Sequence, residues 1–587
     1  MNKTILTASA LLAFGTAFSQ ERNLPNGFSP EELQMMKEGN FTIRGAERGV
    51  TTPPSFPVRT MAQWEEVQTL TLAWTSFPSI QAQIVDAAQE ECEVLIICSD
   101  SNQVKTYLNG AGVPLTNVSF LEEAFNSIWI RDYGAHTVYK NDVDSLLMVE
   151  WIYNRPTRPD DDALPNFIAS YKGIGLYSTT SAPTDLVNTG GNWVVDGFGT
   201  AFASKLILDE NDAGNPYGVT VKSETDIDNI MSNFMGINRY IKMETLPYDL
   251  IHHIDMHMKL MDEENLLFGE YPTGVADGPQ MEANLLYVLN NFNSVFGTPY
   301  KVTRIPMPPS TAGNYPDNGA SYRTYANNVI VNKTVIVPTY RQEYDTTGLR
   351  ILGELMPGYT IVPIDVDNSG ANLIAQSGAI HCITNLIGVD DPLLISHQNL
   401  PDTYDDANPY TVNATIKHKT GIANATLYWS LTPGTGYTSV PMSFVSGSTW
   451  TGNIPAQPQG STVYYYIHAQ ANSGKQQVRP MPAPAGYFDF DVLVTPAGIS
   501  ETTTGLQNIF PNPASAITCI PVNSSIEFEG TLKMYDVFGK LVETIHTGSF
   551  PRGESRYFIH ADKYAAGAYY VVLQSNELKW TQKVMIR

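Results

Sequence analysis

The chain has 587 residues, of which 43% are hydrophobic and 16% are charged, so it holds enough apolar material for a folded core. At about 100–200 residues per domain, this length predicts three or four domains. The 35 Lys and Arg residues against 59 Asp and Glu residues give a net charge of −24. That balance argues against a nucleic acid partner, because such binding depends on cationic contacts to phosphate. An acidic surface attracts cationic substrates, although it also serves to keep an exported protein soluble.

Residues 1–19 have the pattern of a secretory signal peptide. Lys3 gives a positive start, an apolar run follows over residues 5–14, and Ala17 and Ser19 place small residues where a signal peptidase reads them. The run is shorter than the ~20 residues that span a bilayer, and no later segment is long and apolar enough to span one. We expect cleavage after Ser19, an exported product without a transmembrane segment, and a leader or linker over residues 20–56.

The four cysteines are too few for a disulfide scaffold in an exported chain of this size. Cys92 and Cys98 bracket a predicted buried strand and lie too far apart along it to pair. We expect both to be core residues.

From residue 57 to 398, strand patterns alternate with shorter helical patterns, which predicts a mixed α/β domain. The predicted strands are residues 67–74, 93–98, 146–152, 206–208, 266–268, 328–331 and 334–337, and the predicted helices are residues 79–89 and 283–292.

After about residue 400 the helical patterns disappear. Short strand patterns at residues 427–430, 448–451, 462–468 and 488–493 are separated by Gly, Pro and Ser turns. This spacing predicts an immunoglobulin-like β-sandwich over residues 399–495. The composition of residues 496–507 is that of a linker, and residues 508–587 form another small β domain.

The last domain carries three motifs and a characteristic end. They are Asn508-Ile-Phe-Pro-Asn-Pro513, Tyr535-Asp-Val-Phe-Gly-Lys540, Ala565-Ala-Gly-Ala-Tyr-Tyr-Val-Val572 and the terminal Gln582-Lys-Val-Met-Ile-Arg587. In combination they resemble the C-terminal sorting domain of type IX secretion cargo. The resemblance implies passage through the periplasm of a Gram-negative bacterium, recognition by the type IX machinery, and release or attachment at the outer-membrane surface. An ordinary β-sandwich is the alternative.

A polar segment over residues 251–260 holds three histidines and an aspartate. If it is a strand, His253, Asp255 and His257 share one face, because side chains alternate with period two. Such a set suits a transition metal. Alternatively, His253 is a general acid and base and Asp255 binds a cation. A polar strand face that is hydrogen-bonded within the core is the third interpretation.

Cys382 lies far downstream of that segment. A lone cysteine with a distant histidine is a candidate nucleophile pair, and its thiolate needs a lowered pKa or a neighbouring base. A small core residue is the alternative. A zinc site built from Cys382, His253 and Asp255 also stays open, although no standard zinc-binding spacing occurs.

Four clusters carry a second resemblance: Trp129-Ile-Arg-Asp-Tyr-Gly134, Thr189-Gly-Gly-Asn-Trp193, residues 252–257 and residues 377–384. Together they resemble the guanidino-group-modifying enzymes, and among these the agmatine deiminases and the bacterial peptidylarginine deiminases. The resemblance covers residues 57–395. It implies a five-bladed α/β propeller, the pentein fold, for residues 57–398, followed by two all-β sandwich domains. It implies no metal and no organic cofactor.

The resemblance also implies residue roles. Asp132 and Asp255 would hold the guanidinium group, since two carboxylates match its planar set of donors. Cys382 would attack the guanidinium carbon, and His253 would protonate the departing ammonia and then activate the water that hydrolyses the thiouronium intermediate. Asn327, which has Asn328 beside it, stands where the family has a site asparagine. The further residues expected to shape the substrate site are Trp129, Gly191 and Asn192.

The segment Tyr153-Asn-Arg-Pro-Thr-Arg-Pro-Asp160 resembles one in which two arginines bind the C-terminal carboxylate of a peptide substrate. These would be Arg155 and Arg158, and Thr157 is an insertion between them that puts the role of Arg158 in doubt. A surface loop paired with residues 160–162 is the alternative. The leading interpretation is an exported peptidylarginine deiminase that acts on arginine-containing peptides or proteins, preferably at their C-termini. The alternatives are an agmatine or free-arginine deiminase, a metal-dependent hydrolase and a non-catalytic adhesin.

Overall fold

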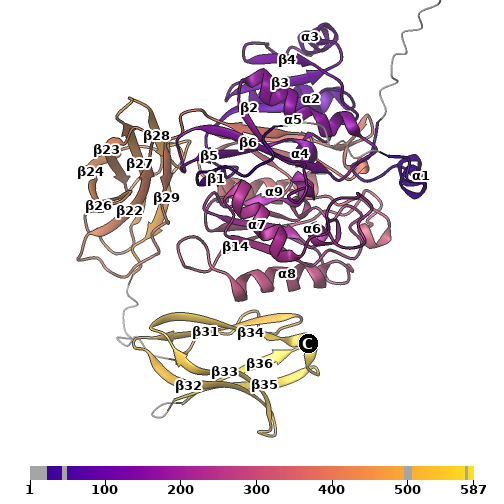
Figure 1. Ribbon diagram of the computed structural model, residues 1–587. Coiled ribbons are helices and arrows are strands. Elements are labelled where there is room, and N and C mark those ends of the chain that lie inside the picture. The colour runs from indigo at the N-terminus through magenta and orange to yellow at the C-terminus, as the bar shows by residue number, and fades with distance from the viewer. Residues whose placement is uncertain (1–22, 42–48, 495–504, 576–578) are drawn as a thin grey trace, which may run out of the picture. The chain divides into compact units, whose positions relative to one another are not determined.

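The computed structural model describes residues 23–41, 49–494, 505–575 and 579–587. The predicted signal peptide and most of the predicted linker at 496–507 lie outside these residues. The chain divides into two units, one up to Leu493 and one from Val494 onward (Figure 1).

The α/β part of the first unit repeats one sheet pattern. Within the described residues, five mixed sheets of three or more strands each contain a central strand that pairs antiparallel with one neighbour. In each sheet a helical connection then leads to a strand that pairs parallel with the central one. Figure 1 shows these sheets in indigo to pink, with helices packed on them.

The strands of each sheet are given in the order in which they lie side by side. The first sheet has β20 (Asn385–Gly388), β2 (Val67–Ala73), β3 (Glu93–Cys98) and β4 (Val118–Glu122). The second has β1 (Val58–Thr60), β5 (His136–Lys140), β6 (Leu146–Tyr153) and β7 (Gly175–Thr179), with β8 (Val187–Asn188) beside β6. The third has β11 (Arg239–Met243), β10 (Thr200–Ser204) and β9 (Val194–Val195), and the fourth has β12 (Met258–Leu260), β13 (Asn265–Glu270) and β14 (Lys301–Pro306). The fifth has β15 (Val329–Val331), β16 (Thr334–Thr339) and β17 (Thr360–Asp365), and β18 (Asp367–Asn368) and β19 (Ala371–Asn372) form a separate pair.

Helices connect or flank these strands. They are α1 (Pro30–Glu38), α2 (Pro78–Ala88), α3 (Ser101–Gly110), α4 (Ile130–Tyr133), α5 (Pro159–Lys172), α6 (Leu206–Asp209), α7 (Glu224–Met235), α8 (Gly278–Asn291) and α9 (Gln342–Leu355), and the short 3₁₀ turns are η1 (Gly190–Asn192), η2 (Ile254–Met256), η3 (Pro316–Asn318) and η4 (Ile374–Gln376).

The central strands are buried on both faces. Strands β2, β3 and β16 are almost entirely inaccessible and have near-continuous apolar sequences, as expected where layers cover both sides of a sheet. Those runs explain why the sequence patterns at residues 67–74, 93–98 and 334–337 coincide closely with observed strands.

The last α/β strand returns to the first sheet. β20 pairs antiparallel with β2, and the paired residues Thr71 and Asn385 lie 314 positions apart in the chain. Arg131 of α4 holds the returning segment: its guanidinium donates to Asn385 Oδ1 (3.1 Å) and to the carbonyl oxygen of His381 (3.3 Å). The loop that precedes β20 is thereby held against α4.

One predicted strand is wrong, and the strand considered for residues 251–260 forms only at its end. Residues 206–208 lie in helix α6, because a short apolar run does not distinguish a buried strand from a buried helix. The predicted strand at 251–260 is a turn followed by η2, and only its last three residues form β12. Asp249 Oδ1 accepts the backbone N–H of Ile251 (3.0 Å) and His252 has φ 55°, so the chain bends there. The argument that alternation places His253, Asp255 and His257 on one face therefore fails.

The all-β part of the first unit has two antiparallel sheets, orange in Figure 1. One sheet has β21 (Leu394–Ser396), β22 (Tyr410–Lys417), β26 (Thr449–Ile454) and β25 (Ser443–Ser446), and the other has β24 (Thr438–Pro441), β23 (Ile422–Ser430), β27 (Thr462–Ala471) and β28 (Gln476–Arg479), with β29 (Phe488–Asp491) beside β27. Their apolar faces share one core.

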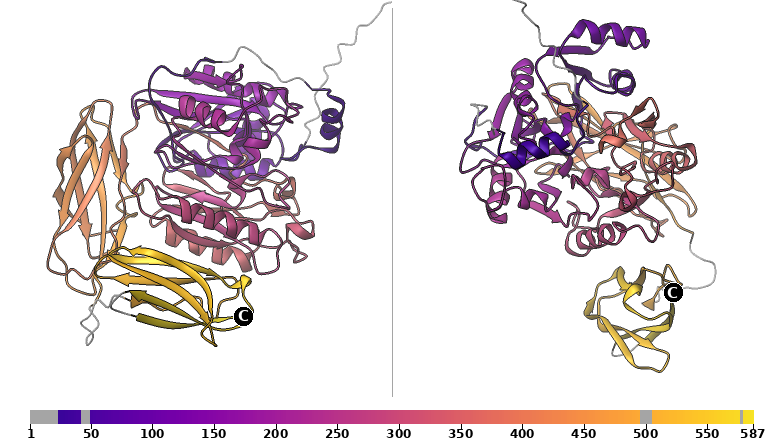
Figure 2. Two further views of the ribbon diagram at one scale, coloured as in Figure 1. Left: turned by 60° about the horizontal axis from the view of Figure 1, so that its bottom comes forward. Right: turned by 90° about the vertical axis from the view of Figure 1, so that its right-hand side faces the viewer.

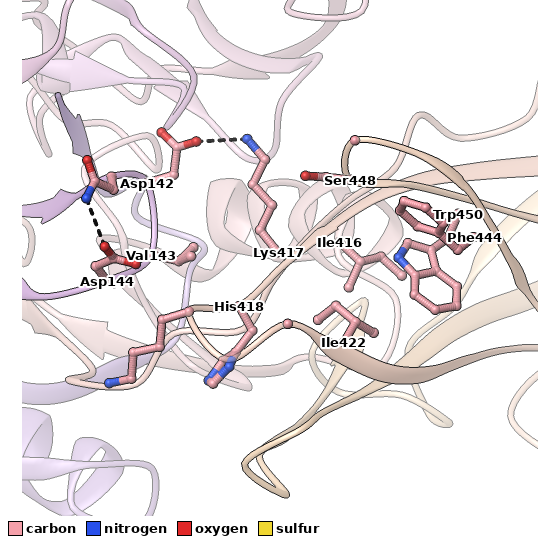
Figure 3. A pocket seen from close by; sticks show the side chains of 14 residues that line it. Asp142, Val143, Asp144, Ile416, Lys417, His418, Ile422, Phe444, Ser448 and Trp450 are labelled. Atoms are coloured by element: carbon pink, nitrogen blue, oxygen red, sulfur yellow. Dashed lines mark hydrogen bonds and ion pairs between the residues drawn. The ribbon is translucent and has the colours of Figure 1, made fainter.

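This all-β part contacts the α/β part through buried and polar groups. Arg479 pairs with Glu263 at 2.7 Å, and both side chains are nearly inaccessible. Lys417 on β22 reaches Asp142 at 2.8 Å across a hollow of about 580 Å³ (Figure 3). Residues of the β5–β6 turn and of the all-β sheets line the hollow, and none of the predicted site residues is among these described residues.

Within its described residues, the second unit is β apart from the short 3₁₀ turn η5 (Ala561–Lys563). Its sheets are β30 (Gly505–Leu506), β31 (Ile517–Ser524) and β34 (Gly553–His560), and β33 (Leu541–Phe550), β32 (Phe528–Asp536), β35 (Gly567–Ser575) and β36 (Lys579–Ile586). β30 extends into the segment predicted as linker. None of the helices that the structure describes in either unit is long and apolar enough to cross a membrane.

The N-terminal segment predicted as a leader or linker is folded in its described part. Ser29 caps α1, and Ser29 and Glu32 form a reciprocal capping box. In the right-hand view of Figure 2, the indigo helix α1 lies across the face of the α/β part that turns toward the viewer.

Candidate active site

Cys382 lies at the centre of a buried polar cluster. Its side chain is inaccessible, and its Sγ lies 3.3 Å from Asn327 Nδ2 and 3.7 Å from Asp255 Oδ2. Asn327 Oδ1 also accepts the backbone N–H of His381 (3.1 Å), so one amide holds both the thiol and its loop. The adjacent Asn328 instead donates to the carbonyl oxygen of Tyr325. The structure thus places Asn327, rather than Asn328, against the thiol.

Asp255 is tied to the residue that precedes the cysteine. Its Oδ2 lies 2.7 Å from His381 Nδ1, and His381 Nε2 lies 2.7 Å from the side chain of Gln63. Lys259 in turn donates to Gln63 Oε1 (2.7 Å) and to the carbonyl oxygen of Asn328 (2.7 Å). Sequence reasoning missed Gln63, which lies in no motif, and gave no role to Lys259, which lies in the polar segment 251–260. Their contacts join segments that are distant in the chain. The position of His381, directly before the cysteine, was a signal that could have been used.

Asp132 forms the other side of the cluster. Its Oδ1 accepts the backbone N–H of Gly191 (3.1 Å) and lies 3.6 Å from His253 Nδ1. Thr189 Oγ1 lies 3.4 Å from His253 Nε2, which holds the imidazole from its other edge. Asp132 and Gly191 belong to α4 and η1, and His253 directly precedes η2, so three turns supply these groups.

Gly191 leaves no room for a side chain. A Cβ at this position would lie 2.3 Å from His253 Nδ1 and 2.9 Å from Asp132 Oδ1. The small size of glycine therefore lets the imidazole and the carboxylate approach each other. The neighbouring Asn192 exchanges hydrogen bonds with the backbone of Ser204 and so fixes the turn rather than the cluster itself.

Burial sets the charge state of the cluster. It raises the pKa of the Cys382 thiol well above its usual value, and the charges of Asp255 and Asp132 raise it further. Burial raises the pKa of Asp132 to about 6, and burial together with the charge of Asp132 raises the pKa of Asp255 well above its usual range. Burial, with the charge of Arg155, lowers the pKa of His253 well below its usual value. The cluster by itself therefore favours a neutral thiol and a neutral imidazole.

Two carboxylate oxygens of the cluster lack a hydrogen-bond partner among the described residues. They are Asp132 Oδ2 and Asp255 Oδ1, and both are buried. A buried carboxylate oxygen without a donor costs free energy, so the pair is arranged for a ligand that brings donors and positive charge.

His257 does not join the cluster. Its ring packs edge-on against Phe268, and neither ring nitrogen has a hydrogen-bond partner among the described residues. Burial lowers its pKa to about 4, which makes it a neutral core residue. Within the described chain, no group of three or more His, Cys, Asp or Glu side chains has the geometry of a metal site.

Arg155 and Arg158 are buried rather than exposed in a surface loop. Arg158 is inaccessible and pairs with Glu32 of helix α1 at 2.7 Å. Of the nearby acidic run, Asp161 accepts the backbone N–H groups of Asn126 and Ser127. Both arginines are buried, so the interpretation as a surface loop is wrong, and Arg158 has Glu32 as an ion-pair partner.

Arg155 lies closer to the centre of the site. Its charge acts on both Asp132 and His253. Its Nε donates to the carbonyl oxygen of Asn26 (3.1 Å), and its guanidinium lies over the ring of Phe28, 4.6 Å from the centroid. Trp129, also inaccessible, donates to the carbonyl oxygen of Leu24 (2.9 Å). The three predicted substrate-binding side chains Trp129, Arg155 and Arg158 thus all contact the N-terminal segment.

Comparisons with known proteins agree with the sequence motifs. Residues 55–387 match the family described as Porphyromonas-type peptidyl-arginine deiminase, and residues 508–587 match the secretion system C-terminal sorting domain. An agmatine deiminase of Pseudomonas syringae is 25% identical over 305 residues, which are 47% of this chain and 78% of that protein. A protein of Vibrio parahaemolyticus provisionally named agmatine deiminase is 24% identical over 380 residues, which are 57% of this chain and 98% of that protein.

A solved structure provisionally named agmatine deiminase superimposes with a TM-score of 0.50 at 19% identity. The match covers 59% of this chain and all of the other. At this identity the likeness is one of fold.

The contacts of Gly191 generate a stability prediction. The Gly191→Ala variant should unfold at a lower temperature than the wild type, because its Cβ overlaps His253 and Asp132, and overpacking typically costs about 1–3 kcal/mol. Thermal unfolding followed by near-UV circular dichroism measures the shift. Gly353→Ala on α9 is the matched control, because a Cβ there meets no described atom within 4 Å. Equal unfolding midpoints for Gly191→Ala and the control would show that the cluster rearranges to accommodate the added Cβ atom.

Proposed function

Because the chain belongs to the Porphyromonas-type peptidyl-arginine deiminase family, we propose that it hydrolyses peptidyl-arginine to citrulline and ammonia, preferably at peptide C-termini. The family consists of hydrolases that deiminate guanidino groups. The observation that carries the proposal is the pair of buried carboxylate oxygens, Asp132 Oδ2 and Asp255 Oδ1, that lack partners among the described residues, in a cluster where the thiol of Cys382 lies 3.7 Å from the other oxygen of Asp255. A guanidinium group has the charge and the planar set of N–H donors that such a pair lacks.

The repeated sheets support a five-bladed α/β propeller as the fold of the deiminase domain. Five sheets share one order of antiparallel and parallel pairing, and the clustered residues come from the turns between them. We assign residues 57–393 to this domain and residues 394–495 to an immunoglobulin-like sandwich, because β21 pairs with β22 of that sandwich and the boundary predicted at residue 398 therefore lies too late. We assign residues 1–19 to a signal peptide.

Substrate binding prepares the nucleophile. A guanidinium group between Asp132 and Asp255 stabilises both carboxylates in their charged form and lowers the pKa of the adjacent thiol. Cys382 then attacks the guanidinium carbon, and the thiol proton passes through the neutral imidazole of His253 to one terminal nitrogen. Ammonia leaves from the tetrahedral adduct, and a cationic S-alkylthiouronium remains on the cysteine.

Hydrolysis of the thiouronium intermediate then releases the cysteine. His253 accepts a proton from water, and the resulting hydroxide attacks the thiouronium carbon. The carbon–sulfur bond breaks, the proton of the added hydroxyl group passes to the departing sulfur and restores the thiol, and the former guanidinium carbon carries the ureido oxygen of citrulline. The proton held by His253 passes to ammonia or to solvent, which returns the neutral imidazole. Asn327 donates to Cys382 Sγ throughout and stabilises negative charge on sulfur.

Charge near the site favours a peptide over agmatine. Agmatine carries a second cationic group, which Arg155 and Arg158 would repel, whereas a peptide C-terminus carries a carboxylate that can pair with them. The sorting domain at residues 508–587 implies export by type IX secretion to the cell surface or beyond, where peptides and proteins are available as substrates. Agmatine and free arginine are the alternative substrates in the tests below.

The nucleophile is tested by the Cys382→Ala variant. Turnover of an arginine peptide should disappear, because removal of a catalytic nucleophile costs on the order of 10⁶ in rate in a well-studied triad. Ammonia and citrulline assays measure the loss. Cys92→Ala, which removes another buried free thiol of the same domain, should retain near-normal turnover. Turnover by Cys382→Ala that is lost with a chelator would instead support a metal-dependent hydrolase, and no ammonia release from any guanidine by the wild type would support an adhesin.

The guanidinium pair is tested by Asp132→Asn and Asp255→Asn. Each variant should lose about 10- to 150-fold in kcat/KM, since a hydrogen bond to a charged group is worth roughly 1.5–3 kcal/mol. Steady-state kinetics on the same peptide give the ratio, and Asp86→Asn, on an exposed position of α2, should match the wild type. Near-normal kcat/KM in both site variants would make these carboxylates structural.

Specificity for a chain end is tested by Arg155→Ala. A peptide with a free C-terminal arginine should be processed ~30- to 1,000-fold more efficiently than the same peptide amidated, since a sheltered charged contact is worth about 2–4 kcal/mol. Arg155→Ala should reduce that ratio by slowing the free-carboxylate peptide, whereas Arg350→Ala, at an exposed position of α9, should leave it unchanged. A ratio near one in the wild type would show that chain ends are not recognised, and agmatine turnover comparable to that of the peptide would favour the alternative substrate.

A further inference from the structure

We propose that residues 24–32 are an intramolecular occupant of a peptide-binding cleft formed by Trp129, Arg155 and Arg158, and that substrate enters only when this segment is displaced. The identification of the cleft as the substrate cleft rests on the proposed function.

The segment binds the cleft through its main chain. Arg158 Nη2 donates to the carbonyl oxygens of Pro25 (2.8 Å) and Gly27 (2.7 Å), Arg155 Nε donates to that of Asn26, and Trp129 Nε1 donates to that of Leu24. Side chains of the cleft therefore donate hydrogen bonds to four consecutive carbonyl groups of the segment. Contacts of this kind do not depend on the side chains of the bound segment, so another extended peptide can make them.

A carboxylate completes the contact. Glu32 Oε1 lies 2.7 Å from Arg158 Nε and Oε2 lies 2.8 Å from Nη2, a bidentate pair, and Thr157 Oγ1 donates to Oε1 (2.8 Å). Although burial alone would raise it, the hydrogen bonds and charge of Arg158 lower the pKa of Glu32 to about 2. Glu32 thus supplies the group that a substrate C-terminus would supply, from the neighbouring helix α1. The inserted Thr157 is part of this contact.

The segment also lies next to the loop of the nucleophile. The backbone N–H of Asn26 donates to the carbonyl oxygen of Gln376 (2.8 Å), and a Cβ on Gly378 would lie 3.2 Å from Asn26 Nδ2. The side chain of Asn26 is inaccessible, and neither of its amide atoms has a partner among the described residues. With the segment in place, Cys382, Asp132 and His253 are all inaccessible.

Helix α1 lacks the anchoring expected of a permanent part of the core. Of its residues, all of which the structure describes, the charged Glu32 alone is buried, whereas Leu33 and Met35 are 46% and 38% exposed. A helix that belongs to a folded core normally buries an apolar stripe. Met36 packs against a small core cluster, and beyond that contact the attachment of α1 depends on one ion pair that a competing carboxylate can replace.

The experiment measures the alkylation rate of each cysteine by iodoacetamide, residue by residue, with mass spectrometry of the full chain. In Glu32→Ala the rate at Cys382 should rise at least ~10-fold over the wild type, because a charged hydrogen bond is lost from the occupant. Glu31→Ala, the matched control, removes the same charge from an exposed position of α1 and should leave the rate unchanged. A synthetic peptide of residues 23–41 should restore slow alkylation to Glu32→Ala.

Two outcomes overturn the proposal. Equal rates at Cys382 in Glu32→Ala and the wild type would mean that the segment does not limit access. Faster alkylation of the buried Cys92 and Cys98 together with Cys382 would mean that α1 is needed for the fold. Phe28→Ala removes the ring beneath Arg155 without leaving a buried charge, and it should raise the rate at Cys382 alone.

Turnover separates this proposal from the proposed function. If alkylation accelerates in Glu32→Ala and arginine peptides become better substrates, the occupant and the deiminase assignment are both supported. If alkylation accelerates but no guanidine is deiminated, the occupant is supported and the deiminase assignment fails. If the wild type deiminates peptides as fast as Glu32→Ala and alkylation is unchanged, the deiminase assignment stands and the occupant is overturned.

Discussion

The antiparallel pairing of β20 with β2 is the contact on which the arrangement of the site depends. It brings the end of the α/β part back to its beginning, and Arg131 of α4 holds that end through hydrogen bonds to His381 and Asn385. Together with the hydrogen bond from the backbone N–H of Arg131 to the carbonyl oxygen of Cys382 (3.1 Å), this pairing fixes the loop that carries Cys382 relative to Asp132. Closing so long a loop costs conformational entropy, so the strand pair and the buried guanidinium have to offset that cost.

Desolvation is the second constraint. The cluster places two carboxylates, a thiol and two imidazoles where water is excluded, and the buried cations Arg131 and Lys259 act on the same groups. Burial, followed by the charge of Arg131, lowers the pKa of Lys259 to about 7, so this ammonium is also easily neutralised. Such a site has little net charge of its own and responds strongly to a cation that enters it.

The sequence predicted the features that have local signatures. The strands at 67–73 and 93–98 are continuous apolar runs, and the residues around Cys382 lie in short motifs that the structure brings together. The predictions failed where contacts between distant segments decide the local structure. An Asx turn at Asp249 and a left-handed His252 end the predicted strand at 251–260, and neither has a signature strong enough to override the apolar alternation.

The partner of Arg158 shows the same limit. It is Glu32, 126 residues away, whereas three aspartates stand next to Arg158 in sequence. Asp161 and Asp162 accept backbone N–H groups, and Asp161 is also stabilised by the charge of Arg158, but proximity in sequence did not reveal the ion pair with Glu32.

The raised pKa of the buried Cys382 bears on chemical durability outside the cell. Thiolates react with peroxide and with disulfides far faster than thiols do. An exported protein with four unpaired cysteines meets such oxidants without a reducing cytoplasm around it. The Cys382 thiol, buried and with a raised pKa, is therefore held in the form that resists oxidation, and under the proposed function only a bound cationic substrate would change that form. The same desolvation that keeps the thiol unreactive therefore extends the working lifetime of the protein in an oxidising environment.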